Sequence, residues 1–172
     1  MSGRFRYFVE GPCEKVFVKA FMFCDGQSFQ EGQIEVINFV NERISRAFAR
    51  TIQRNSKVVI VIDTDVENTE ILDSNIDMLQ KVSMISKEDI YIVMSIHSFE
   101  DEIVYSCLNV SNIHQLFSTS GISEFKKKFI AHKELNKKLE SVGFDMNKIW
   151  SRKPTNVFSK YQNNGNKIKK HS

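Results

Sequence analysis

The sequence KVVIVID, from Lys57 to Asp63, decides the fold of this chain. Its five central residues are all β-branched, and such residues favour an extended strand. Because they leave no polar face, both sides of the strand must be covered by other parts of the protein. A parallel sheet with helices on both faces provides that cover, so the stretch predicts an α/β protein.

Three further extended runs and four helical stripes lie on either side of this strand. The extended runs are residues 6–9, 34–39 and 90–96. Apolar residues recur at the helical spacing of i, i+3, i+4 and i+7 within residues 13–24, 40–52, 72–82 and 99–108. Strands and helices therefore alternate along the chain. This order predicts a Rossmann-like parallel sheet of about four strands between helices.

The rest of the chain lacks a further strand pattern. Residues 113–150 show only helical spacing, and the residues from 151 onward look irregular. A chain of 172 residues suits one domain with a single core. We therefore expect an α/β core over residues 1–120, with residues 121–172 forming a basic, helical C-terminal extension that packs on this core.

Charge is divided unevenly between these two parts. The net charge of the whole chain is +3, but residues 121–172 carry 13 Lys and Arg against 4 Asp and Glu. The first 120 residues are acidic, with 11 basic and 17 acidic groups. A basic end on an acidic body suggests a polyanionic partner such as nucleic acid. The alternative is a solvated tail that aids solubility.

Composition also disfavours several classes of protein. No apolar run approaches the ~18 residues that span a bilayer, so no membrane partner is expected. The N-terminus leads directly into a strand-like run, which leaves no room for a signal peptide. Cys13, Cys24 and Cys107 fall on the apolar helical stripes without metal-ligand spacing. We interpret them as reduced core residues of a cytoplasmic protein.

Acidic residues follow two of the predicted strands. Glu10 and Glu14 come after the first strand, and Asp63 and Asp65 come at the end of the third. Ligands of open α/β sheets bind at the carboxyl ends of the strands, so these acids meet if the two strands are neighbours. Clustered carboxylates repel one another, and a bound cation relieves the repulsion. Oxygen ligands with room for water suit Mg²⁺ or Mn²⁺.

The same residues carry a resemblance to a known family. The sequence FVEGPCEK, residues 8–15, resembles the VEGxxE signature of TOPRIM domains of the OLD-like nuclease kind. The sequence VVIVIDTD, residues 58–65, resembles the strand and DxD motif of the same domains. The resemblance implies a TOPRIM-like fold, with the two glutamates binding metal on one side and the two aspartates on the other. No glycine follows the DxD closely, which is a departure from the primase and topoisomerase branch.

Two further acids are candidate metal ligands. Small defence-associated TOPRIM-like proteins of the RloB kind have a serine-to-Phe-Glu stretch similar to residues 95–100, and this resemblance implies that Glu100 completes the site. The alternative is a helix N-terminus, with Ser98 as N-cap and acids in the first turn. Glu67 is either a ligand or a loop acid. His97 is either a proton shuttle or a structural residue.

Basic residues supply the candidate nucleic-acid contacts. Lys126 and Lys127 lie in a helical pattern, where they form either a phosphate-tracking face or a solvated one. Arg152, Lys153 and Lys160 lie in a segment that also contains aromatic residues, which can stack on unpaired bases. OLD-like nucleases use a basic residue near their metals, and any of these three fits that role. The alternative is that the aromatic residues anchor the segment to the domain.

Together these features predict a divalent-metal-dependent nuclease that hydrolyses phosphodiester bonds of DNA or RNA. Glu10, Asp63 and Asp65 are its predicted catalytic residues, and Mg²⁺ or Mn²⁺ is its predicted cofactor. The family resemblance implies a role in antiphage or plasmid-exclusion defence beside an ATPase partner, and it is compatible with a homo-oligomer.

Two other functions remain open. Residues 63–66 also fit the DxDxV motif of haloacid-dehalogenase-like phosphatases, with Asp63 as nucleophile and Asp65 as acid/base. That motif lies on the third strand here rather than the first, and it leaves Glu10 unexplained. The other possibility is a non-catalytic TOPRIM-fold subunit that binds nucleic acid through its basic tail.

Overall fold

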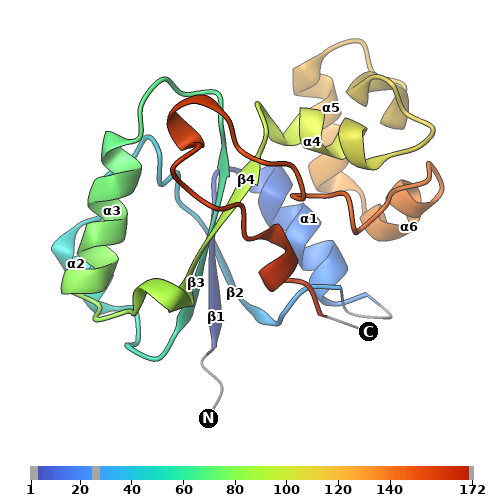
Figure 1. Ribbon diagram of the computed structural model, residues 1–172. Helices are drawn as coiled ribbons and strands as arrows, with labels where there is room; N and C mark the ends of the chain where they lie inside the picture. Colours follow the sequence, from blue (N-terminus) through green and yellow to red (C-terminus); the bar gives the residue numbers. More distant parts are fainter. Residues whose placement is uncertain (1–3, 25–27, 171–172) are drawn as a thin grey trace.

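The computed structural model describes residues 4–24 and 28–170. Within them, four strands form one all-parallel sheet in the order β2-β1-β3-β4 (Figure 1). The strands are β1 (Phe5–Val9), β2 (Gly32–Val36), β3 (Lys57–Asp63) and β4 (Ile90–Ser95). The predicted α/β fold with a Rossmann-like parallel sheet is confirmed, and the first and third strands are neighbours.

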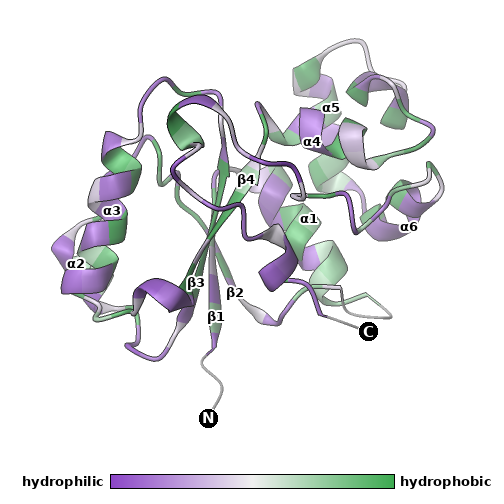
Figure 2. Cartoon of the chain, viewed as in Figure 1, coloured by the Kyte–Doolittle hydropathy of each residue, from purple (hydrophilic) through white to green (hydrophobic). Residues whose placement is uncertain are grey.

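Helices cover both faces of this sheet, with their apolar sides turned inward (Figures 1 and 2). One face carries α2 (Arg46–Arg50) and α3 (Glu70–Lys81). The other carries α1 (Pro12–Met22), α4 (Phe99–Ser106), α5 (Ile122–Ala131) and α6 (Leu135–Glu140). Short 3₁₀ helices are η1 (Lys87–Asp89), η2 (Ile113–Leu116), η3 (Asn156–Phe158) and η4 (Gly165–Lys167). No helix within the described residues is long and apolar enough to cross a membrane.

Strand β3 contributes to both layers of the core, as its composition predicts. Val58, Ile60 and Ile62 pack in the layer of α2 and α3, whereas Val59 and Val61 pack in the layer of α1 and α4. All five side chains are at most 1% exposed. Full burial of one such aliphatic side chain contributes about 1.5–3 kcal/mol, so β3 is the main hydrophobic support of the sheet.

The segment between β2 and α2 differs from the prediction. The strand ends at Val36 rather than at residue 39, and the helix spans Arg46–Arg50 rather than residues 40–52. Asn75 of α3 accounts for the shorter elements, because its side chain bonds to the backbone of residues 39, 42 and 44 at 2.7–3.0 Å. These bonds satisfy backbone groups that would otherwise require a helix or a strand.

The three cysteines are free, and Cys13 and Cys107 are buried as predicted. Two of them nevertheless lie just beyond the observed helices, although the apolar spacing placed them inside. Cys24 is only partly buried and follows the end of α1, and Cys107 follows the end of α4 and forms an isolated β-bridge with Phe144. Leu108, which the apolar spacing placed in the same helix, is 71% exposed because the helix has already ended.

Residues 151–170 are irregular, as expected, apart from two 3₁₀ turns and an isolated β-bridge of Lys169 with Phe29, yet two of their asparagines are bonded to the sheet. Asn163 and Asn164 exchange hydrogen bonds of 2.8–3.1 Å with the backbone of Ile92 and Met94. This segment therefore runs beside the outer edge of β4 (Figure 1) and occupies hydrogen-bonding positions that a further strand would use.

Two aromatic residues fasten this region to the core. Trp150 and Phe158 are each 1% exposed, and they belong to the two different core layers. The structure thus supports the alternative in which aromatic residues anchor the C-terminal segment. Stacking of Phe158 on an unpaired base is contradicted, because the ring is already buried in the layer of α2 and α3.

Candidate functional site

The carboxyl ends of β1 and β3 bring the predicted acids together. Glu10 directly follows β1, and its Oε2 accepts a hydrogen bond of 3.0 Å from the backbone N–H of Asp63, the last residue of β3. Glu14 is buried in the first turn of α1. A Cβ atom at Gly11 would lie 3.1 Å from Oε2 of Glu14, so the glycine leaves room for that carboxylate.

Asp63 is the electrostatic centre of this cluster. Its pKa is raised to about 8, chiefly by burial and then by the negative charges of Glu14 and Glu10, while a hydrogen bond from the backbone of Phe99 opposes the shift. Its Oδ1 atom is buried and has no hydrogen-bond partner among the described residues. A buried carboxylate oxygen without a donor is costly, so this atom favours either a proton or a cation.

Glu14 and Glu10 are shifted in the same direction. The pKa of Glu14 is raised to about 7, chiefly by burial and in smaller part by the charges of Glu10 and Glu100. Burial also raises the pKa of Glu10, although the hydrogen bond from the Asp63 backbone offsets part of the rise. Three carboxyl groups therefore resist ionisation together, as expected where like charges share a poorly solvated site.

Asp65 and Glu67 lie farther out, on the exposed loop after β3. The charge of Asp65 still acts on Glu10, whose pKa it raises. Glu67 is exposed, and no contact of its side chain connects it to the cluster within the described residues. The geometry brings Asp65 to the rim of the site and leaves Glu67 as a loop acid.

Glu100 joins the cluster from α4. Its charge raises the pKa of both Glu14 and Asp63, and its carboxylate forms an ion pair of 3.1 Å with Lys126. The N-cap interpretation also holds, because the Ser98 hydroxyl accepts a hydrogen bond of 3.2 Å from the N–H of Asp101. The two sequence interpretations are therefore compatible, since the cap presents Glu100 toward the acids.

Lys126 of α5 is the basic residue at this cluster. Partial burial lowers its pKa, but the hydrogen bond and charge of Glu100 outweigh that effect and raise it. Its positive charge in turn lowers the pKa of Glu10 and Glu14. The sequence left Lys126 on either a phosphate-tracking face or a solvated one, because no local pattern links α5 to α1. Lys127, its neighbour, is exposed.

Thr64 holds the loop after β3 against the loop after β4. Its backbone N–H donates to the carbonyl oxygens of Ser95 and His97, each at 3.1 Å, and its hydroxyl accepts from the N–H of His97 at 2.8 Å. His97 has a φ of 72°, a conformation that is strained for a residue with a Cβ atom. His97 is exposed, and the hydrogen bonds of its backbone within the described residues hold the two loops together.

The predicted cations of the C-terminal segment lie in different surroundings. Arg152 donates from Nε and Nη2 to Glu102 at 3.0 and 2.6 Å, and from Nη2 to the carbonyl oxygen of Ile96. Lys160 forms an ion pair of 2.7 Å with Asp73. Lys153 is exposed. A phosphate group would therefore compete with existing partners at the first two positions.

The oxygen atoms of these acids can be compared with the ligands that a divalent cation requires. Glu10, Glu14 and Asp63 offer only carboxylate oxygens, which are the ligands that Mg²⁺ and Mn²⁺ prefer. The unpartnered Oδ1 of Asp63 and the raised pKa values fit a cation at this position. Among the described residues, however, no three His, Cys, Asp or Glu side chains are already gathered closely enough to hold a metal ion.

Comparisons of the chain with protein-family models, with curated proteins and with solved structures find no match. The class of protein that the structure defines is an α/β protein with a Rossmann-like parallel sheet and acids at the carboxyl ends of its strands. The resemblance to TOPRIM domains stays a prediction from the two acidic motifs.

Proposed function

We propose that this protein is a divalent-metal-dependent nuclease whose site lies at the carboxyl ends of β1 and β3. The observation that carries the proposal is the buried Oδ1 of Asp63, which has no hydrogen-bond partner in the described part of the chain and lies beside two further acids. A structural role would be expected to pair this atom with a donor, because an orphaned buried oxygen costs roughly 1–3 kcal/mol. In a cation-binding site, the bound cation would be the partner of this oxygen atom.

Glu10, Glu14 and Asp63 would hold Mg²⁺ or Mn²⁺, with Asp65 and Glu100 at the rim. A bound divalent ion would lower the pKa of a coordinated water and polarise a phosphoryl oxygen. The N–H of Asp63 keeps Glu10 oriented toward the site. Thr64 keeps the loops after β3 and β4 together, so that the acids that follow both strands lie at the same end of the sheet.

Lys126 is the residue we propose for stabilising negative charge that develops on the phosphodiester. It is the cation whose charge acts on Glu10 and Glu14, and about half of its side chain is exposed. A cation beside developing charge, in a site with little water, typically contributes 10²- to 10³-fold in rate, about 2.7–4 kcal/mol. Lys127 and Lys153 are exposed, and we propose them for phosphate contacts farther along the nucleic acid.

The first test separates metal binding from catalysis. Thermal unfolding of the wild type and of Glu14→Gln should be followed with increasing Mn²⁺, with Glu140→Gln on an exposed position of α6 as control. The wild type and the control should gain about 2.7 kcal/mol at 100 times the dissociation constant, and Glu14→Gln should gain much less. An unchanged melting temperature of the wild type at concentrations that support cleavage would contradict direct binding.

The second test addresses the reaction. Cleavage of labelled single- and double-stranded DNA and RNA should be measured with Mg²⁺ and with Mn²⁺, in the wild type, Lys126→Gln and Lys127→Gln. We expect Lys126→Gln to lower kcat about 100-fold, and Lys127→Gln to raise KM with little change in kcat. Binding without cleavage would favour the non-catalytic subunit. Release of phosphate from a small phosphomonoester that survives Glu10→Gln would favour the phosphatase.

A further inference from the structure

A cavity of about 860 Å³ lies at the end of the sheet opposite to the acids. Its lining includes the residues at or near the beginnings of all four strands, namely Phe5, Gly32, Lys57 and Tyr91. Because the sheet is parallel, all four amino ends meet here, whereas all four carboxyl ends meet at the acidic site. The two sites are therefore separated by the length of the strands.

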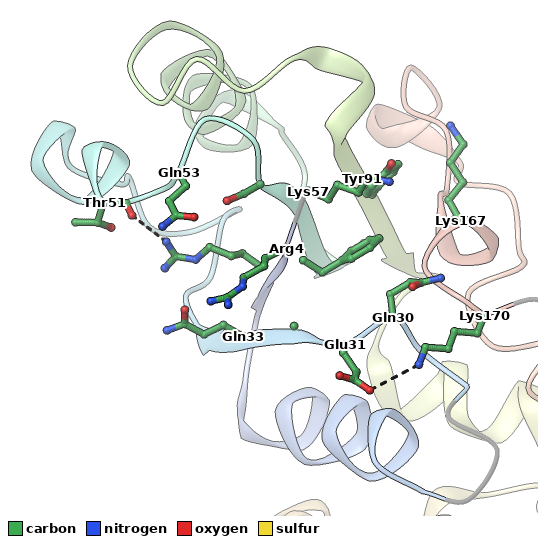
Figure 3. Close-up of a pocket in the computed structure, with 14 residues that line it drawn as sticks. Arg4, Gln30, Glu31, Gln33, Thr51, Gln53, Lys57, Tyr91, Lys167 and Lys170 are labelled. Carbon is green, nitrogen blue, oxygen red and sulfur yellow. Dashed lines mark hydrogen bonds and ion pairs between the residues drawn. The ribbon is translucent and has the colours of Figure 1, made fainter. Parts of the chain in front are cut away.

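The cavity has a strongly positive lining. Among the described residues that line it, five are Lys or Arg and one, Glu31, is acidic. Figure 3 shows Arg4 on one side of it, Lys167 and Lys170 on the other, and Lys57 between them. Within the described part of the chain, no carboxylate forms an ion pair with Arg4, Lys57 or Lys167. Uncompensated cations that face one hollow form a binding site for an anion.

Arg6 adds a partly buried guanidinium to this lining. Its Nη2 pairs with Glu35 on the neighbouring strand β2, and its Nη1 donates to the carbonyl oxygen of Thr51 at 3.2 Å. Its Nε is buried and has no partner within the described residues. The side chain is 13% exposed, so its position is largely set by the protein before any ligand arrives.

Aromatic rings line the same cavity. Phe5 and Tyr91 are partly buried, and their rings stack with centroids 6.1 Å apart and an angle of 21° between their planes. Lys57 lies 5.4 Å from the ring centroid of Phe5, and Lys167 lies 5.9 Å from that of Tyr91. Aromatic rings next to cations are the combination that proteins use to stack a base while neutralising its phosphate.

Amide side chains complete the lining. Gln30, Gln33 and Gln53 border the cavity from two segments of the chain, and Figure 3 shows them around the cationic residues. Each amide carries both hydrogen-bond donors and acceptors, as the edges of nucleobases do. The lining therefore offers a partner for each part of a nucleotide: cations for the phosphate, rings for the base face and amides for the base edge.

We propose that this cavity binds a nucleotide unit, either a free nucleotide or one residue of a single strand. Arg4, Lys57 and Lys167 contact the phosphate, and Tyr91 stacks with the base. The cavity is too far along the sheet to share ligands with the acids, so binding here requires neither a metal ion nor Asp63. The inference thus stands independently of the proposed nuclease activity.

The test measures anisotropy of a fluorescent ten-nucleotide single strand in EDTA. The pocket variant Lys57→Gln/Lys167→Gln is compared with Lys133→Gln/Lys148→Gln, which removes the same charge at positions on the α5–α6 side of the protein. We expect the pocket variant to weaken binding about tenfold and to flatten the log–log salt dependence by roughly 0.7 for each phosphate that the protein no longer neutralises. The control should change the dissociation constant less than twofold. Equal effects of the two double variants, or no binding by the wild type, would overturn the proposal.

Two further arms sharpen the result. Tyr91→Leu should weaken binding of the strand about tenfold if its ring stacks on a base, and unchanged affinity in this folded variant would refute the base-binding part. Unlabelled adenosine monophosphate that displaces the probe identifies a free-nucleotide site, and displacement by oligonucleotides alone identifies a strand site. Displacement by inorganic phosphate at the same concentration as the nucleotide would reduce the site to a phosphate pocket and refute base recognition. Retained binding by Asp63→Asn shows that this site is independent of the acidic one, whereas loss of binding would overturn that independence.

Discussion

Glu102 and Asp63 are both carboxylates near the carboxyl end of the sheet, but their surroundings differ in hydrogen-bond donors. Glu102 of α4 is fully buried and accepts from the backbone N–H groups of Ile96 and Trp150 at 3.1 and 2.8 Å. It also accepts from Nε and Nη2 of Arg152 at 3.0 and 2.6 Å. Asp63 has an Oδ1 atom with no donor among the described residues, and burial together with three acidic neighbours raises its pKa.

The difference shows how burial alone misleads. Glu102 is the more buried of the two, yet its charge is satisfied by the protein, and it ties the C-terminal segment to α4 through Arg152. At Asp63 and Glu14, by contrast, burial and neighbouring negative charges outweigh the contacts that favour ionisation, so both pKa values are raised. The Glu102–Arg152 ion pair connects two parts of the structure. The arrangement at Asp63 and Glu14 favours a proton or a cation as partner. Substitutions and changes of pH can test each side of this contrast.

The largest effect is expected from Glu102→Ala. Removal of this carboxylate leaves the guanidinium of Arg152 and two backbone N–H groups without their acceptor. Loss of one partner of a buried pair typically costs 3–5 kcal/mol, so we expect a decrease of about 3–5 kcal/mol in the free energy of unfolding. Urea denaturation measures this quantity, and Glu140→Ala at an exposed position should change it by less than about 0.5 kcal/mol. A loss below about 1 kcal/mol would show that the Glu102–Arg152 ion pair contributes little to stability.

The next effect concerns pH and the acids at the strand ends. The pKa values of Glu14 and Asp63 are about 7 and about 8 in the folded protein, compared with ordinary values of 4.5 and 3.8. The folded state thus binds more protons than the unfolded state between these values, so stability is fully present below about pH 4 and is lost as pH rises through 7 and 8. In a chelator, we expect the free energy of unfolding to fall by about 3–4 kcal/mol between pH 6 and pH 8.

The matched control for this pH dependence is the double variant Glu14→Gln/Asp63→Asn. It lacks both raised groups, so its free energy of unfolding should be nearly flat over the same interval. Saturating Mn²⁺ should oppose the loss in the wild type alone, because a cation replaces the missing protons. Identical pH profiles of the wild type and the double variant would place the titration elsewhere in the molecule.

A smaller effect is expected from Asp63→Asn in the absence of metal. The amide keeps an acceptor for the N–H of Phe99, adds a donor toward the neighbouring acids and carries no charge. We expect it to raise the free energy of unfolding at pH 8 by about 1–3 kcal/mol, since it removes repulsion among three carboxylates. Nuclease activity should fall by about 100-fold or more in the same variant. A destabilised variant with normal specific activity would refute the site.

The smallest effect is expected from Arg152→Lys. Lysine keeps the charge beside Glu102 but cannot bond it through two nitrogens in a plane, as Arg152 does. We expect a loss of about 1 kcal/mol in the free energy of unfolding, well below that of Glu102→Ala. Binding of nucleic acid should stay close to that of the wild type. A large loss of binding with unchanged stability would instead return Arg152 to the nucleic-acid contacts.

Local patterns predicted much of this architecture. The run at residues 57–63 and the alternating helical stripes indicated the parallel sheet, because a strand that is buried on both faces is a continuous run of apolar residues. Local signals failed where a distant side chain replaced regular backbone bonding. Asn75 holds residues 39–44 in a loop despite their helical spacing, and Asn163 and Asn164 bond to β4 from an irregular segment.

The candidate site divides in the same way. The sequence by itself determined which acids follow which strands, and therefore that Glu10, Glu14 and Asp63 converge if β1 and β3 are neighbours. Only the tertiary structure decided that they are neighbours, that Lys126 of α5 is the cation beside them, and that Arg152 is engaged by Glu102. The physical reason is the sequence separation of the residues that interact. Strand and helix patterns arise from contacts within a few residues, whereas the charge state of a carboxylate depends on residues distant in the sequence that the fold places next to it.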